Sequence, residues 1–82
     1  MKTITIVGLG YVGLPAACLC AEKGLKVYGL DIDNNKVELI NKNQSPIKDD
    51  YIINKLKKVK IHATTNPAEC IPNSDVVIIC VP

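Results

Sequence analysis

Three glycines near the amino terminus, Gly8, Gly10 and Gly13, have the spacing of a turn that can hold a phosphate group. In this Gly-x-Gly-x-x-Gly pattern the first glycine lets the chain turn sharply out of a strand. The second lets the backbone approach a pyrophosphate, and the third lets the following helix pack closely on the sheet. Unpaired N–H groups and aligned peptide dipoles at the start of that helix attract an anion without a basic side chain. The spacing therefore indicates recognition of a diphosphate.

An acidic residue, Asp31, follows the glycines at the distance that a dinucleotide site requires, directly after the β-rich run 25–30. A carboxylate at this point can accept hydrogen bonds from both hydroxyls of an adenosine ribose, and its charge repels the 2′-phosphate of NADP. The glycines alone are weak evidence, because such turns also serve only to join a strand to a helix. Together with the strand, the helix and the acid, they predict that the chain binds NAD.

The elements that must position these residues are predicted from hydrophobic periodicity and from helix-capping residues. We expect four strands, at residues 2–7, 25–30, 59–64 and 75–81. We expect helices at residues 11–23, from Asp33 or Asn34 to 43, around 51–56 with acidic residues at its start, and over the short segment 66–72. The first strand should be central, and the alternating pattern of 59–64 suggests an edge or a half-exposed position. The unbroken apolar run of 75–81 needs both faces of that strand to be buried, which only further chain or a partner could complete.

Strands that alternate with helices predict an α/β fold, here a Rossmann-like doubly wound parallel sheet. A complete dinucleotide fold needs two βαβαβ halves, and a chain of 82 residues provides only the first, with four strands. We therefore expect residues 1–82 to be the amino-terminal part of an NAD-binding domain, a fragment that lacks the rest of that domain and the substrate domain.

Composition excludes several other classes of protein. Ten basic and eight acidic side chains give a net charge of +2, and the lysine-rich run 55–60 lacks aromatic residues, so we expect no nucleic-acid partner. No apolar stretch approaches the ~20 residues of a membrane span, and the amino terminus lacks the order of a signal peptide, so we expect a cytoplasmic protein with no membrane partner.

The cysteines form no Cys-x-x-Cys pair, which argues against a metal site and against a catalytic nucleophile. We expect them to be small buried residues in a reducing compartment. The four are Cys18, Cys20, Cys70 and Cys80.

Several segments beyond the glycines form a more specific pattern. They are GLGYVGLP at 8–15, GLDID at 29–33 followed by Lys36-Val37, Ile40-Asn41, Ser45-Pro46-Ile47 with Asp50-Tyr51, and DVVIICVP at 75–82. With these segments the chain resembles the amino-terminal part of the UDP-glucose/GDP-mannose dehydrogenase family over essentially its whole length. The tyrosine in the glycine motif and the Ser-Pro-Ile segment are much more specific than the glycines.

Members of that family oxidise the C6 alcohol of a nucleotide sugar to a carboxylate in two successive hydride transfers that consume two NAD. The resemblance therefore implies NAD as cofactor and a nucleotide sugar as the substrate of the full-length protein. The family's catalytic cysteine, its assisting lysine and asparagine, and its sugar pocket lie beyond position 82, so no catalytic residue is assigned and the chain alone is expected to be inactive. Within the family, a glycine turn with proline at position 15 leans slightly toward enzymes that act on UDP-N-acetylhexosamines such as UDP-N-acetylmannosamine or UDP-N-acetylglucosamine. UDP-glucose and GDP-mannose stay open as substrates.

The resemblance also implies individual cofactor contacts. Tyr11 and Val12 would contact the pyrophosphate through their backbone, Asp31 the adenosine ribose, and Lys36 a ribose or phosphate oxygen. Val81 and Pro82 would begin the loop beside the nicotinamide half. The predicted cofactor-binding residues are Gly8, Gly10, Tyr11, Val12, Gly13, Asp31, Lys36, Val81 and Pro82.

Alternatives stay open for single residues. Tyr11 can be a half-exposed loop residue, Lys36 a solvated helix residue, and Ser45-Pro46 a plain turn. His62 is expected at the surface and has no assigned role. The apolar surface of residues 75–81 favours self-association of this piece by itself. For the full-length protein, the resemblance leads us to expect a homo-oligomer.

Two alternatives stay open for the whole chain. One is a regulatory domain of a channel or transporter that senses NAD or another adenine nucleotide without chemistry, and Ser45-Pro46-Ile47 and Val81-Pro82 argue against it. The other is a β-hydroxyacid dehydrogenase, which often has a basic or small polar residue where this chain has Asp31.

Overall fold

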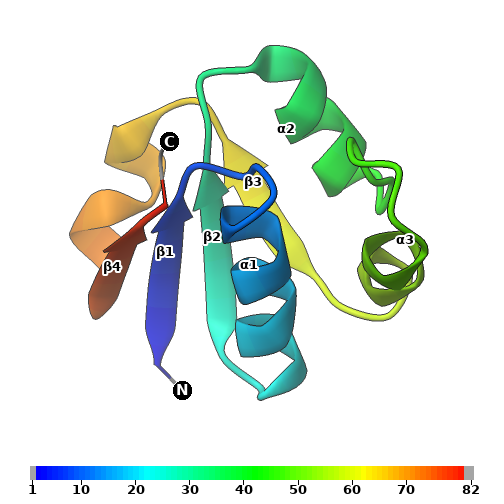
Figure 1. The fold of residues 1–82 in the computed structure, drawn as a ribbon. Coiled ribbons are helices and arrows are strands. Elements are labelled where there is room, and N and C mark those ends of the chain that lie inside the picture. The colour runs from blue at the N-terminus through cyan, green and yellow to red at the C-terminus, as the bar shows by residue number, and fades with distance from the viewer. Residues whose placement is uncertain (1, 81–82) are drawn as a thin grey trace.

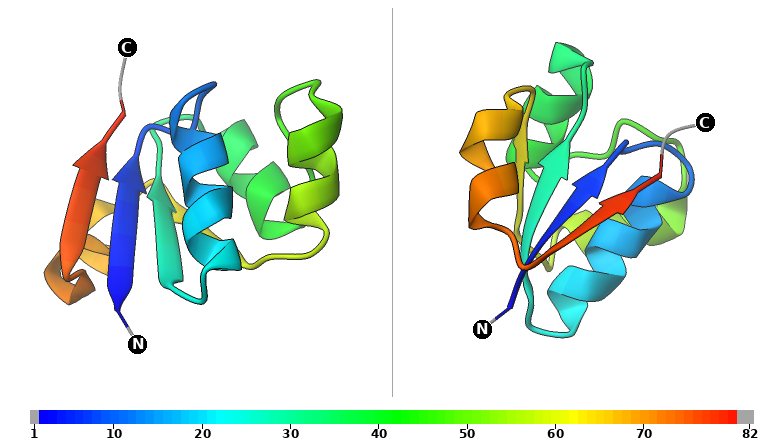
Figure 2. Two further views of the ribbon diagram at one scale, coloured as in Figure 1. Left: turned by 60° about the horizontal axis from the view of Figure 1, so that its bottom comes forward. Right: turned by 90° about the vertical axis from the view of Figure 1, so that its left-hand side faces the viewer.

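The computed structural model describes residues 2–80 as a four-stranded parallel sheet between α1 on one face and two short 3-10 turns on the other (Figures 1 and 2). The predicted positions Val81 and Pro82 lie outside the described residues. In chain order the elements are β1 (Thr3–Val7), α1 (Gly13–Glu22), β2 (Lys26–Leu30), α2 (Asn34–Asn41), α3 (Asp50–Leu56), β3 (Ile61–Thr64), η1 (Pro67–Glu69), η2 (Ile71–Asn73) and β4 (Val76–Ile79).

Most of the predicted elements are present with shorter bounds, α3 begins one residue earlier, at Asp50, and one element differs in kind. α1 begins at Gly13, so Tyr11 and Val12 belong to the preceding turn and not to the helix. The helix predicted at 66–72 is instead the pair of 3-10 turns η1 and η2. Pro72 lacks the N–H that a continuous helix would need, and this prevents one helix from running through the segment.

All three strand pairs are parallel, in the order β3-β2-β1-β4. β1 is central, as predicted, and β3 lies at an edge in agreement with its alternating pattern. Ile6 of β1 lies opposite Gly29 of β2 and Ile78 of β4. Because the strands run in one direction, their carboxyl ends meet at one edge of the sheet, where the segments that follow the strands come together.

The core lies between the sheet and α1, and α3 packs against α1. Its buried side chains include Ile4, Ile6, Val27 and Ile61 from the strands, Leu14, Ala17 and Cys18 from α1, and Ile52 and Leu56 from α3. Between residues 2 and 80 no helix is long and apolar enough to cross a membrane.

The cysteines are free thiols, two of them buried and two partly buried. Burial, with the charge of Glu22, raises the pKa of the Cys18 thiol to about 11, so this thiol stays protonated at neutral pH. No group of three or more His, Cys, Asp and Glu side chains among residues 2–80 is placed to hold a metal ion.

β4 carries the apolar run whose burial was expected to need further chain or a partner, and in this chain the strand is exposed. Its four side chains are all exposed, from 38% for Ile78 to 69% for Ile79. The reason is its position at an edge of the sheet, where only β1 lies beside it. An apolar run thus predicts a strand correctly, but it cannot say on which side of the sheet that strand has a neighbour.

Asn41 at the end of α2 binds the other edge of the sheet, at β3, while Asn43 just after α2 binds the end of α3 and the segment before β3. The side chain of Asn41 donates to the carbonyl of Ala63 and accepts from its N–H, both at 2.9 Å. Asn43 has a left-handed backbone with φ 61°, and its side-chain amide donates to the carbonyls of Leu56 at 2.8 Å and Val59 at 3.2 Å. α2 therefore satisfies, at Ala63, backbone groups that a further strand would otherwise bind.

Replacing Asn41 by Ala should lower the free energy of unfolding by about 1–2 kcal/mol, because both hydrogen bonds to Ala63 are lost. Asn54→Ala, at an exposed position of α3, is the matched control and should change that free energy by less than about 0.5 kcal/mol. Urea unfolding followed by circular dichroism measures both variants. Equal effects of the two substitutions would contradict the role given to Asn41.

Candidate functional site

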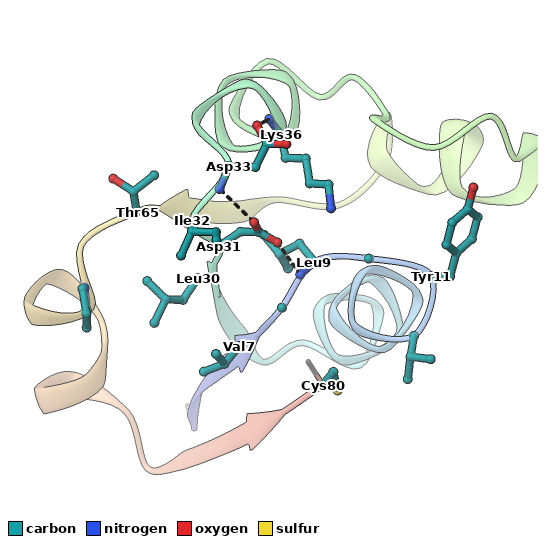
Figure 3. A pocket seen from close by; sticks show the side chains of 14 residues that line it. Val7, Leu9, Tyr11, Leu30, Asp31, Ile32, Asp33, Lys36, Thr65 and Cys80 are labelled. Atoms are coloured by element: carbon teal, nitrogen blue, oxygen red, sulfur yellow. Dashed lines mark hydrogen bonds between the residues drawn. The ribbon is translucent and has the colours of Figure 1, made fainter. Parts of the chain in front are cut away.

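A cavity of about 950 Å³ lies at the carboxyl ends of the strands, where the turn after β1 meets the end of β2 (Figure 3). A site at this edge is the general rule for open α/β sheets. The lining comes from residues 7–12 at the end of β1, residues 30–33 and Lys36 after β2, Thr65 and Pro67 after β3, and Cys80 after β4.

Gly8 and Gly13 are required by the fold itself. A Cβ atom at Gly13 would lie 1.6 Å from the carbonyl oxygen of Gly8, so α1 can begin here only without a side chain. Gly8 has a φ of 94°, a backbone conformation that other residues rarely adopt. The turn out of β1 and the close packing of α1 therefore each depend on one glycine of the motif.

Gly10 has a different reason to be glycine. A Cβ atom built on it would meet no heavy atom within 4 Å, and the residue lines the cavity. Nothing among residues 2–80 excludes a side chain at this position. Its absence instead leaves open space directly over the backbone of the turn, which is the space that a bound diphosphate would need.

Backbone N–H groups at the start of α1 are available to an anion. The first helical hydrogen bond runs from the Leu14 N–H to the Gly10 carbonyl at 3.0 Å, so the N–H groups of Tyr11, Val12 and Gly13 precede it. Leading N–H groups and the helix dipole favour negative charge at this place. The side chain of Tyr11 is 83% exposed and points away from Asp31 (Figure 3), so its ring is an exposed loop side chain.

Asp31 lies between the glycine turn and α2. Its Oδ2 atom accepts from the Leu9 N–H and its Oδ1 atom from the Asp33 N–H, both at 2.9 Å (Figure 3). Partial burial alone would raise the pKa of Asp31, but the N–H groups of Asp33 and Leu9 and the charge of Lys36 outweigh burial and hold this pKa below its ordinary value. The carboxylate is therefore ionised at neutral pH and gives the cavity a fixed negative charge.

Lys36 is held beside this carboxylate by the start of α2. Asp33 is the N-cap, and its side chain accepts from the backbone N–H groups of Asn35 at 2.9 Å and Lys36 at 3.3 Å. The side chain of Lys36 is half-buried and lines the cavity (Figure 3). This position is compatible with the predicted contact to a cofactor, which stays a prediction.

The Ser45-Pro46 turn has a local role. The Ser45 hydroxyl donates to the carbonyl of Ile47 at 2.6 Å and accepts from its N–H at 3.1 Å. Ile47 enters the core, and these residues are not among those that line the cavity. The plain-turn alternative is thus the better description of this segment.

The structure brings together Gly8, Gly10, Tyr11, Val12, Asp31 and Lys36 in the cavity lining, while Gly13 lies behind the turn. The cavity lining also contains residues that were not predicted from the sequence. Ile32 is 98% exposed at the cavity, and Thr65 and Cys80 line it after β3 and β4. Applying the rule that parallel strands end at one edge to all four strands would have found Thr65 and Cys80.

Comparisons with known proteins agree with this geometry. The sequence model of the UDP-glucose/GDP-mannose dehydrogenase family, NAD binding domain, matches residues 2–82. The chain is 44% identical to UDP-glucose 6-dehydrogenase of Campylobacter jejuni over 96% of this chain and 21% of that protein. It is 36% identical to UDP-N-acetyl-D-mannosamine dehydrogenase of Salmonella typhimurium over 98% of this chain and 19% of that protein.

The fold of the chain also matches that of a solved structure. The crystal structure of a ternary complex of GDP-mannose dehydrogenase from Pseudomonas aeruginosa matches with a TM-score of 0.92 at 35% identity, over 100% of this chain and 20% of that chain. The present chain thus spans about one-fifth of the length of the relatives that it matches.

Replacing Gly13 by Ala should lower the free energy of unfolding by about 3 kcal/mol or more, because the new methyl group overlaps the Gly8 carbonyl and forces α1 away from β1. Gly10→Ala, in the same turn, is the matched control and should change this free energy by less than about 1 kcal/mol. Urea unfolding of both variants provides the comparison. A Gly13→Ala protein as stable as Gly10→Ala would show that α1 does not start against β1 as described.

Proposed function

The chain belongs to the UDP-glucose/GDP-mannose dehydrogenase family, and we propose that its cavity holds the adenosine diphosphate half of NAD. The observation that carries the proposal is the open space over Gly10, which lies between the first N–H groups of α1 and the carboxylate of Asp31. In this arrangement the backbone of Tyr11 and Val12 donates to the pyrophosphate, while Gly8 and Gly13 act through the shape of the turn.

The adenosine ribose is assigned to Asp31 and Lys36. An ionised carboxylate offers about four acceptor positions, and the N–H groups of Leu9 and Asp33 use two of them. The remaining positions accept the ribose hydroxyls, and Lys36 donates to a ribose or phosphate oxygen. Because the charge of Asp31 repels a 2′-phosphate, NAD binds more tightly than NADP. A role for Val81 and Pro82 beside the nicotinamide half stays a prediction.

For the whole protein we propose oxidation of the C6 alcohol of a nucleotide sugar to a carboxylate with two NAD. NAD supplies the hydride acceptor, and the residues that act on the sugar lie outside this chain, so the chain alone reduces no NAD. The relatives are named for UDP-glucose, UDP-N-acetyl-D-mannosamine and GDP-mannose. By the resemblance, the Pro15 form of the glycine turn leans slightly toward UDP-N-acetylhexosamines, and UDP-glucose and GDP-mannose stay open. A cytoplasmic location and a homo-oligomeric assembly of the whole protein stay predictions.

Gly10→Ala should weaken NAD binding about tenfold or more while the fold is retained, because a methyl group then occupies the diphosphate space. Lys36→Gln should weaken binding about threefold to tenfold through loss of a charged donor. Lys58→Gln, an exposed lysine outside the cavity lining, is the matched control and should bind NAD as the wild type does. Isothermal titration calorimetry measures all three, and wild-type affinity in Gly10→Ala would refute the proposed pose.

The substrate is tested by following NADH absorbance with the whole protein and four nucleotide sugars in parallel: UDP-N-acetylmannosamine, UDP-N-acetylglucosamine, UDP-glucose and GDP-mannose. We expect two NADH for each sugar oxidised with one of the UDP-sugars. Saturable NAD binding without reduction by any of the four would instead favour the nucleotide-sensing alternative.

A further inference from the structure

Three consecutive residues at the end of β2 hold the glycine turn in place. The side chain of Leu9 is fully buried and packs over Gly29, where an added Cβ atom would lie 2.7 Å from Leu9 Cδ1. The carbonyl of Leu30 accepts from the Gly8 N–H at 2.8 Å. The carboxylate of Asp31 accepts a hydrogen bond from the Leu9 N–H at 2.9 Å. Of these three contacts, this one alone is made by a polar side chain.

The other oxygen of the same carboxylate fixes the start of α2. Oδ1 accepts from the Asp33 N–H, and Asp33 in turn caps the helix that presents Lys36 to the cavity. One carboxylate therefore joins two walls of the cavity, the glycine turn and the start of α2, before any ligand binds (Figure 3).

We propose that Asp31 is a positioning residue for the diphosphate as well as a ligand of the ribose: its carboxylate fastens the Leu9 N–H and so holds the turn in the form that receives the pyrophosphate. This inference rests on the proposed NAD site. Its consequence is that the residue at position 31 sets affinity for every nucleotide with a diphosphate, including nucleotides without ribose hydroxyls.

The chemistry of a neutral substitute shows why the two roles are coupled. The side chain of asparagine has the size of aspartate but only one oxygen, so one of the two backbone N–H groups would face an NH₂ group that cannot accept. Either the turn or the start of α2 would then lose its partner. Neutralising position 31 to admit a 2′-phosphate would for this reason also loosen the diphosphate site, and such a variant would bind NADP less tightly than the wild type binds NAD.

The test compares two ligands, ADP and 2′,3′-dideoxy-ADP, which differ only in the ribose hydroxyls. Calorimetry on Asp31→Asn should show that 2′,3′-dideoxy-ADP binds roughly five- to tenfold more weakly than to the wild type, although this ligand has no hydroxyl for Asp31 to accept. The wild-type preference for ADP over 2′,3′-dideoxy-ADP should also shrink in the variant, which reports the ribose contact separately.

Asp75→Asn is the matched control. The Asp75 carboxylate also accepts a backbone N–H, from Thr3 at 2.8 Å, but at the amino ends of the strands and away from the cavity lining. This variant should bind both ligands as the wild type does. Unchanged affinity of Asp31→Asn for 2′,3′-dideoxy-ADP would overturn the proposal and leave Asp31 as a ribose ligand only.

A ligand-free measurement on the wild type separates this proposal from the proposed function. Amide hydrogen exchange should show the Leu9 N–H to be protected relative to the N–H of Tyr11, which precedes the first helical hydrogen bond. Equal exchange at the two positions would overturn the positioning role. Protection at Leu9 in a protein that binds neither ADP nor NAD would support the fastening of the turn and refute only the NAD site.

Discussion

The contact between Gly13 and the carbonyl of Gly8 fixes where α1 begins relative to β1, and the rest of the site depends on that position. Since no side chain fits between them, the first turn of the helix lies directly against the end of the central strand. Its leading N–H groups are thereby directed to the carboxyl edge of the sheet, beside the ends of β2 and β4. A helix start displaced by the width of a methyl group would aim the same N–H groups elsewhere.

The cavity combines few charges with many backbone groups. An anion is attracted by N–H groups and a helix dipole, and the carboxylate of Asp31, which contacts the turn, is held by the N–H groups of Leu9 and Asp33. These donors compensate part of its charge and lower its pKa, so it stays ionised close to an anion site. In the proposed site, the remaining charge would accept ribose hydroxyls and repel a 2′-phosphate.

The two edges of the sheet differ in the side chains that lie along them. Beside β3, the side chain of Asn41 occupies the backbone groups of Ala63 and closes the edge at that residue. β4 forms the other edge with four apolar side chains that are at least 38% exposed. Edge strands with exposed apolar side chains favour pairing with another surface, whereas an edge occupied by a polar side chain does not. Among the described residues, β4 is therefore the element best suited to an interaction outside this sheet.

Local sequence determined the elements of this protein and the chemistry of its ligand. Glycine spacing, the acid after the second strand and the capping residues Asp33 and Asn66 act within a few neighbouring residues, so they could be interpreted without a structure. The central place of β1 also followed from its β-branched residues, whereas the full order of the strands came from the structure. The exact ends of α1 and the division of 66–72 into two turns did not follow, since they depend on close packing and on the missing N–H of Pro72.

Tertiary structure decided which further residues join the predicted ones in the cavity lining, and what Asp31 contacts. Thr65 and Cys80 line the cavity because four strand ends meet at one edge, and no local pattern marks them. The exposure of β4 depends on which strand lies beside it, which an apolar run does not encode. The sequence determined that an acid follows β2, but only the folded chain brings the Leu9 N–H, 22 positions away, to within 2.9 Å of its carboxylate. Hydrogen bonds between such distant residues exist only after the sheet has formed, and they fix the positions of the motif residues relative to one another.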